Sequence, residues 1–284
     1  MALKDILVQV DETRGLEARL RIAAELAARN EAHLTGLFVI ENVSFSALAA
    51  PGGPDFVAAD AFLQLQDQHR QARLKVAERL VQTFDAAVKA AGVNSSEWRI
   101  AEDDAASAAT LHARYADLAV LGQQDPERPP LGPAVVEAVL LSSGRPVLVV
   151  PFIGADSIGK RVLVAWNATR EAARAVNDAL PLLGQAEKVT VLAINPERGI
   201  GGEGELPAAD IALHLARHGV KAEAAHTTAD DVGIGDVLLS RASDFSADLI
   251  VMGGYGHSRA RELVLGGATR TLLRHMTVPV LLSH

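Results

Sequence analysis

The sequence predicts an α/β protein made of two tandem domains, each a doubly wound sheet of five parallel strands. Three observations lead to this prediction. Several segments recur in the same order in the two halves of the chain. Short runs of Val, Ile and Leu alternate with helical patterns throughout. The length of 284 residues suits two compact domains better than one.

The internal repeat rests on four pairs of matching segments. They are KDILVQVDETR (4–14) with KRVLVAWNATR (160–170), HLTGLFVI (33–40) with KVTVLAIN (188–195), ADLAVLGQQ (116–124) with ADLIVMGGY (247–255), and RPVLVVP (145–151) with VPVLLSH (278–284). The offset falls from 156 and 155 residues to 131 and 133, so the first unit has extra residues in its middle. We therefore expect domains at 1–152 and 158–284, joined near 152–159.

The elements follow in order from the local patterns. Aliphatic runs in the first half predict strands at 6–10, 33–40, 97–102, 117–122 and 146–150. Helical spacing predicts helices over 16–30, 61–92, 105–115 and 134–142, with Gly92 capping the second. The second half repeats this order with a shorter middle. Such strands, separated by helices, are typical of a parallel sheet covered on both faces. Its ligand crevice lies at the carboxyl ends of the strands, where the strand order reverses.

Composition excludes several classes of function. A net charge of −8 argues against general binding to nucleic acids or anionic membranes, which requires a basic face. The absence of cysteine excludes disulfides, thiolate metal sites and a cysteine nucleophile. The opening MALKDILVQVDET reads as a strand rather than a signal peptide, and no apolar run approaches the roughly 18 residues of a membrane helix. We expect a cytoplasmic protein with neither nucleic-acid nor membrane partners.

The stretch GGYGHSRARELVLGGATR at 253–270 is the strongest candidate for a site. It is not a Walker loop, because no lysine follows Lys221, and it is not a dinucleotide loop, because Arg259 stands where the third glycine belongs. The spacing present is Gly253-x2-Gly256-x9-Gly266-Gly267. Glycines directly before a helix leave backbone N–H groups bare for an anion.

Two further features favour a phosphate site in this stretch. Thr269 can add a hydroxyl, and four arginines form a basic patch in an acidic protein: Arg259, Arg261, Arg270 and Arg274. A glycine-rich connection with solvated arginines explains the same residues equally well, because such loops are common.

This glycine spacing follows a strand that ends in Met-Gly and precedes a helix and a final strand of the PVL type. In this arrangement the sequence resembles the ATP-binding universal stress protein family. The resemblance covers both halves of the chain. It implies a flavodoxin-like or Rossmann-like sheet and binding of ATP, with or without Mg²⁺. It also implies a stress-response or signalling role rather than metabolic turnover.

The resemblance also implies which residues of the second domain would hold the nucleotide. Asn167 would meet the ribose or base, and the backbone near Ile194 the adenine. The phosphate end would involve Met252, Gly253, Gly256, His257, Gly266, Gly267, Ala268 and Thr269, with His257 also explained as a solvent-facing loop residue. Asn167 replaces the aspartate of the family and Gly267 its serine or threonine. Both departures should weaken binding without abolishing it.

The first unit lacks the corresponding loop. Gly122 is followed by QQDPERPPLGP, in which Asp125 stands where Gly256 does, and Pro133 has no N–H to donate. This half keeps Asp11 but has lost the glycines whose N–H groups would bind an anion. We therefore expect one competent nucleotide site in each chain.

Other constellations are weaker. His214 and His218 have a spacing that can bind zinc on a helix, but no third ligand is evident. The pairs Asp103–Asp104 and Asp230–Asp231 read as helix N-caps, with magnesium ligation as the alternative. Trp166 ends a strand at the crevice, where its ring either stacks on a base or packs against other side chains.

Three functions remain open at this stage. The first is a nucleotide-binding regulatory protein, in which hydrolysis is slow or absent because neither a general base nor a Walker lysine is visible. The second is an interaction scaffold of the same fold that binds no nucleotide. The third, an adenylating enzyme, lacks the pyrophosphate loop it would need after the first strand.

The final strand of each half is apolar and is a candidate edge strand, which must be covered from solvent. We expect the two halves to form a pseudo-dimer through them, and two chains to form a homodimer.

Overall fold

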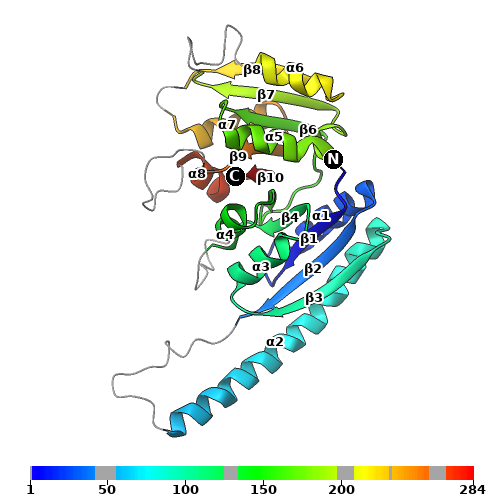
Figure 1. Ribbon diagram of the computed structural model, residues 1–284, viewed down its shortest axis with the longest axis vertical. Helices are drawn as coiled ribbons and strands as arrows, with labels where there is room; N and C mark the ends of the chain where they lie inside the picture. The colour runs from blue at the N-terminus through cyan, green and yellow to red at the C-terminus, as the bar shows by residue number, and fades with distance from the viewer. Residues whose placement is uncertain (1, 42–55, 125–133, 197–207, 230–231, 256–266) are drawn as a thin grey trace.

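The structure is a computed structural model that describes residues 2–41, 56–124, 134–196, 208–229, 232–255 and 267–284, the side chains of 56–61 excepted. Figure 1 shows the two halves of the chain, one above the other. No helix in these ranges combines the length and hydropathy that a membrane span requires.

In its described residues, the first half contains five strands and four helices in alternation. They are β1 (Asp5–Val10), α1 (Leu16–Asn30), β2 (His33–Ile40), α2 (Phe56–Ala91), β3 (Ser96–Glu102), α3 (Ala105–Ala113), β4 (Leu118–Gly122), α4 (Val135–Ser142) and β5 (Val147–Val150). The predicted elements are all present. Helix α2 begins at Phe56, earlier than the pattern predicts, and α3 ends at Ala113.

The second half repeats this order. Its elements are β6 (Arg161–Trp166), α5 (Arg170–Leu183), β7 (Lys188–Ile194), α6 (Ala209–Arg217), β8 (Ala222–Thr227), α7 (Ile234–Asp244), β9 (Leu249–Gly253), α8 (Gly267–His275) and β10 (Val280–Ser283). The fold class predicted from the sequence is confirmed.

All ten strands belong to one sheet, in the order β3-β2-β1-β4-β5-β10-β9-β6-β7-β8. The pairing is parallel within each half. The halves meet where β5 pairs antiparallel with β10, with Leu281 opposite Leu148. Each final strand therefore covers the edge of the other, so neither is left open to solvent.

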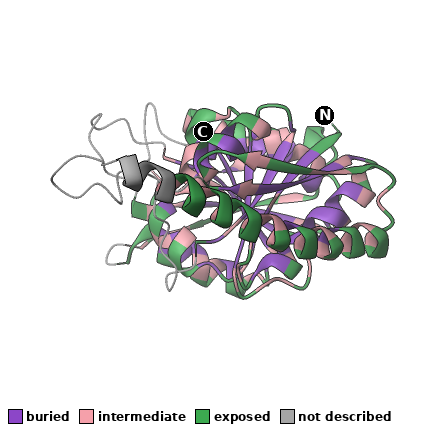
Figure 2. Cartoon of the chain, turned by 90° about the horizontal axis from the view of Figure 1, so that it is seen from below, coloured by how far each residue is buried: buried purple, intermediate pink, exposed green. Residues whose placement is uncertain are grey.

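Helices cover both faces of this sheet. One layer contains α1, α2, α5 and α6, and its apolar side chains form a core with one face of the strands. The other layer contains α3, α4, α7 and α8. Figure 2 shows buried strands in the middle of the molecule and exposed helix surfaces outside them. Burial on both faces explains why the strands read as continuous aliphatic runs.

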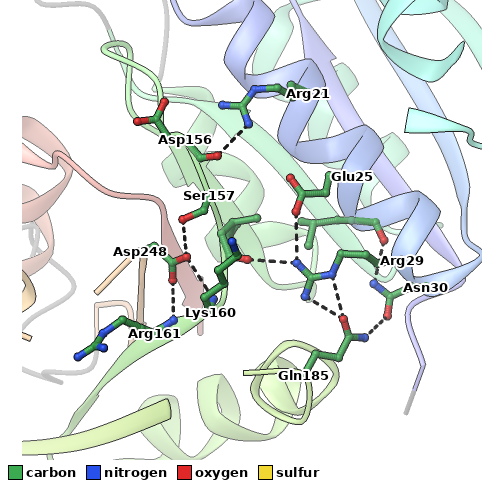
Figure 3. A network of polar contacts seen from close by, with 12 residues as sticks. Arg21, Glu25, Arg29, Asn30, Asp156, Ser157, Lys160, Arg161, Gln185 and Asp248 are labelled. Atoms are coloured by element: carbon green, nitrogen blue, oxygen red, sulfur yellow. Dashed lines mark hydrogen bonds and ion pairs between the residues drawn. The ribbon is translucent and has the colours of Figure 1, made fainter. Parts of the chain in front are cut away.

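The segment that joins the halves is fixed by hydrogen bonds on both sides (Figure 3). Arg29 of α1 donates to the carbonyl of Ile158 at 3.1 Å and to the side chain of Gln185 at 2.8 and 3.1 Å. Gln185 in turn donates to Asn30. Arg21 donates to the carbonyls of Ala155 and Asp156. The join is thus part of the packed structure.

A repeated contact confirms the relationship of the halves at atomic level. Asp117 accepts hydrogen bonds from the N–H groups of Lys4 and Asp5, at the start of β1. Asp248, its counterpart, accepts from the N–H groups of Lys160 and Arg161, at the start of β6.

Candidate functional site

The candidate site lies where the strand order of the second half reverses, between β6 and β9. These strands pair in parallel, with Ala165 opposite Met252, so their carboxyl ends open onto the same edge of the sheet. In doubly wound sheets, ligands bind at this position. The residues that follow β6 and β9 therefore define the site.

Asn167 follows β6 and is held in a tight turn. Its Oδ1 accepts hydrogen bonds from the N–H of Thr169 at 3.3 Å and from its hydroxyl at 2.9 Å. The two acceptor positions of the oxygen are thus used within the turn. The exposed side chain retains its amide Nδ2, for which the described residues offer no partner. Asn167 can therefore donate to a ligand more readily than it can accept.

Helix α5 begins directly after this turn, and its first turn contains a carboxylate side chain. Thr169 caps the helix by accepting from the N–H of Ala172 at 3.3 Å. Glu171 in the first turn is 4% exposed and pairs with Arg170. Burial raises the pKa of Glu171, but the hydrogen bonds from Arg170 and the backbone outweigh it and hold the pKa below its usual range. The N-terminus of α5 is therefore already occupied by a carboxylate.

The end of β7 is fixed by its neighbour strand. Ile194 is half-buried against the core, and its register partner on β8 is Thr227. Asn195 has a left-handed backbone with φ of 49°. Its side chain accepts from the N–H of Ala229 at 2.7 Å and donates to the carbonyl of the same residue at 2.8 Å. Two hydrogen bonds thus hold the turn that follows the backbone expected to contact adenine.

The end of β9 shows why its glycines are needed. Met252 is buried in the core. A Cβ on Gly253 would lie 2.6 Å from the backbone N of Ala172, so this glycine allows α5 to pack against the strand. A Cβ on Gly254 would lie 2.8 Å from Leu140 of α4, in the other domain. Close packing explains these two glycines without reference to a ligand.

Helix α8 supplies the other side of the candidate site. Gly267 is its first residue and is exposed, and a Cβ built there meets no atom within 4 Å. Ala268 is half-buried and Thr269 is 3% exposed. Gly267 and Ala268 are thus the residues of this helix start that solvent reaches. Gly256, His257 and Gly266 lie outside the described residues.

The first domain has a different arrangement at the equivalent position, between β1 and β4. Asp11 forms the same turn as Asn167, accepting from the N–H of Thr13 at 3.0 Å and from its hydroxyl at 2.5 Å. Arg19 of α1, 1% exposed, extends into this position and pairs with Asp11 at 2.7 Å. Its Nε donates to the carbonyl of Gln9 at 2.8 Å.

This guanidinium fills the space beside β4. A Cβ on Gly122 would lie 1.9 Å from the Nη1 of Arg19. Burial raises the pKa of Asp11, but the Arg19 charge and the hydrogen bonds from Thr13 and Arg19 outweigh it and hold the pKa below its ordinary value. In the second domain the offset of 156 residues places Ala175 where Arg19 stands. Among the described residues, a buried arginine is therefore found in the first crevice and not in the second.

Sequence reasoning did not identify Arg19, although one signal was present. Arg19 lies on the apolar stripe of α1, between Leu16 and Ala23, where a charged side chain is buried only with a partner. Among the other predicted residues, Asp104 caps α3, accepting from the N–H groups of Ala106 and Ser107 at 3.0 Å. Its proposed role as an N-cap is confirmed.

The zinc alternative gains no support from the described residues. The rings of His214 and His218 lie 4.8 Å apart on α6. Within the described ranges, no group of three His, Cys, Asp or Glu side chains could hold a metal ion.

Comparison with known proteins gives the family. The model of the universal stress protein family matches residues 2–151 and 159–284. A match of 46 residues, 41% identical, links the chain to universal stress protein Slr1230 of Synechocystis, and it covers 16% of each protein.

Solved structures agree on the fold. A universal stress protein from Archaeoglobus fulgidus superposes with a TM-score of 0.70 at 18% identity, covering 98% of this chain and 96% of that one. A second, described as a putative universal stress protein from Pseudomonas aeruginosa, gives 0.57 at 16% identity over 99% and 93%. The chain belongs to the universal stress protein family and consists of two family units in tandem.

Proposed function

We propose that the chain binds one adenine nucleotide, ATP, in its second domain and uses this binding in a regulatory or stress-response role. The difference between the two crevices carries the proposal. Arg19 fills the crevice of the first domain, whereas the second domain has Ala175 at that position. Among the described residues, no buried guanidinium corresponding to that of Arg19 lies between β6 and β9; the start of α5 packs against Gly253 there.

The charges of the second crevice support binding at α8 rather than α5. The start of α5 already contains Thr169 as cap and Glu171 as first-turn anion. The start of α8 presents the exposed Gly267, with no acidic residue in the first turn. An anionic phosphate is stabilised at such a helix start by bare N–H groups and by the helix dipole.

Under this proposal the phosphates lie at Gly267 and Ala268, and on the loop that contains Gly256, His257 and Gly266. The nucleoside lies near Asn167 and Ile194. Met252 and Thr269 support the site from the protein interior, and Gly253 by allowing close packing. The sequence offers no Walker lysine, so hydrolysis is slow or absent. We further propose a cytoplasmic location and a homodimer.

Calorimetry with ATP, in the presence and absence of Mg²⁺, tests the proposal. Two variants at one position make the test specific, because a Cβ on Gly267 meets no atom of the described residues within 4 Å. Gly267→Ser adds a hydroxyl donor and should tighten ATP binding several-fold. Gly267→Asp keeps the helix start favourable for folding but places a negative charge at the phosphates, so binding should be lost.

The proposal is wrong if the wild type does not bind, or if wild type and Gly267→Asp bind equally. Gly266→Asp provides an independent variant of the same loop. Gln82→Glu serves as control, because it adds one negative charge at an exposed position of α2 in the first domain.

The nucleotide-independent scaffold is the alternative function, and the first domain favours it in one respect. That half keeps the fold of the family with an ion pair in place of a ligand site. Mass spectrometry of the purified protein separates the two functions. A co-purified adenine nucleotide contradicts the scaffold.

A further inference from the structure

The two domains meet at the ends of β4 and β9, and the residues there differ. The offset of 131 residues makes Gln123 the counterpart of Gly254. Each follows the last glycine of its strand and lies beside the partner domain. Their backbone N–H groups make equivalent hydrogen bonds, to Val150 and to Ser283, but the side-chain contacts of Gln123 have no equivalent at Gly254.

Gln123 is 4% exposed, and its side chain crosses the domain boundary. Its Nε2 donates to the carbonyl of Leu273 at 2.9 Å and to that of Arg274 at 3.1 Å. Its Oε1 accepts from the N–H of Phe152 at 3.1 Å. The amide thus links the last turn of α8 to the start of the segment that joins the domains.

These carbonyls belong to the last turn of α8, which ends at His275. The last four carbonyls of a helix have no partner within the helix, so a buried donor that satisfies two of them fixes the helix end. Glycine at the counterpart position, 254, can supply no such donor, and Leu140 of α4 fills the space instead. At this pair of equivalent positions, the first domain supports α8 through an amide, and the second domain offers no side-chain donor.

Helix α8 has nine residues and begins at Gly267, so its two ends are about 13 Å apart at 1.5 Å per residue. A helix of this length moves as a rigid element, because its hydrogen bonds join one turn to the next. A side chain that fixes the last turn therefore also fixes the direction of the N–H groups in the first turn.

The first domain supports the start of the glycine loop as well. Gly254 packs against Leu140 of α4, and Tyr255, with a left-handed φ of 57°, lies beside Glu137 of the same helix. Burial, followed by the Glu137 charge, raises the pKa of the Tyr255 hydroxyl. Gly254 and Tyr255, which directly follow β9, thus lie against α4 of the first domain.

We propose that Gln123 of the first domain is a positioning residue for the nucleotide site of the second domain, which it supports by holding the C-terminal end of α8. The expected effect on ATP binding rests on the proposed function. The hydrogen bonds from Gln123 to the end of α8 do not depend on any ligand. The first domain is then a fixed support for the phosphate end of the site.

The test uses the full chain and the variant Gln123→Met, which keeps the length of the side chain but cannot donate to the carbonyls. Gln185→Met is the matched control, because Gln185 also joins the two domains but contacts Arg29 and Asn30 rather than α8. Hydrogen exchange of the ligand-free proteins gives the first readout. Gln123→Met should speed exchange in peptides covering 267–276 several-fold, and Gln185→Met should leave it unchanged.

Calorimetry gives the second readout. Gln123→Met should weaken ATP binding about 5- to 10-fold, the lower range of ordinary couplings between sites. Adenosine, which has no phosphates, should bind the variant within about twofold of its affinity for the wild type. A role limited to general stability would change both ligands alike.

Three outcomes are decisive. Unchanged exchange in α8 would overturn the inference, and so would an equal loss of ATP and adenosine affinity. Faster exchange together with a selective loss of ATP would support it. If the wild type binds no ATP, the proposed function fails, and exchange alone then decides whether Gln123 holds the helix.

Discussion

Arg19 and Gly122 are complementary, because the guanidinium of the first occupies the space that a side chain on the second would need. The distance of 1.9 Å from the Nη1 of Arg19 to a Cβ at position 122 leaves no room for both. We expect Gly122→Ala to lower the free energy of unfolding by about 1–3 kcal/mol, the usual cost of overpacking.

Denaturant unfolding measures this effect. In the background Arg19→Met, the same alanine should cost less, because a flexible side chain without hydrogen bonds can move aside. Equal costs in the two backgrounds would show that another atom limits position 122. Gly267→Ala is the control and should be neutral or stabilising, since a Cβ there meets nothing.

The ion pair of Asp11 and Arg19 predicts a particular dependence on pH. The pKa of Asp11 is lowered in the folded chain, so the unfolded chain binds a proton more tightly. The stabilisation is therefore fully present above the ordinary aspartate pKa of about 3.9. It is lost as pH falls through the folded pKa.

Asp11→Asn should be less stable than the wild type at neutral pH by about 3–5 kcal/mol, because Arg19 is left buried without its counter-ion. The difference should shrink below about pH 4, where the unfolded wild type binds a proton that the folded chain does not yet take up. Unfolding curves between pH 3 and pH 7 check this expectation. A constant difference across that range would contradict it.

The contact of Gly254 with Leu140 predicts coupling across the domain boundary. Gly254→Ala should cost about 1–3 kcal/mol, since its Cβ would lie 2.8 Å from a methyl group of Leu140. Leu140→Ala alone should cost about 2–5 kcal/mol through the cavity it creates. The double variant should cost less than the sum, which a double-mutant cycle measures. Additive effects would mean that the two residues do not pack as described.

The cap of α3 predicts a smaller effect in the first domain. Asp104→Ala should lower the free energy of unfolding by about 1 kcal/mol, because two N–H groups of the first turn lose their acceptor. Asp104→Asn keeps an acceptor and should stay close to the wild type. Equal losses in both variants would assign the effect to charge rather than to capping.

Most of the fold could be predicted from the sequence because its signals are local. Aliphatic runs and helical spacing depend on neighbouring residues, and the repeat supplied two readings of each element. Asp104 could be recognised as a cap for the same reason. The boundaries of α2 and α3 were less accurate, since helix ends depend on capping and packing beyond the pattern.

The site was less predictable because its contacts join distant residues. Gln123 reaches carbonyls 150 and 151 positions away, and no local pattern marks such a contact. Gly253 was assigned to phosphate approach, but its immediate reason is the backbone of α5. A glycine in the sequence indicates that a side chain would not fit at that position. The sequence does not indicate whether a ligand or a packed helix occupies the space.

The antiparallel pairing of β5 with β10 has one more consequence. It relates the halves much as a two-fold axis would relate the subunits of a dimer, but the covalent link frees the halves from identity. In a dimer of identical chains, every substitution appears twice, so a buried arginine would close both crevices together. Here Arg19 of the first half corresponds to Ala175 of the second, and Gln123 corresponds to Gly254. Fusion thus permits a broken symmetry, in which equivalent positions of the two halves contain different side chains.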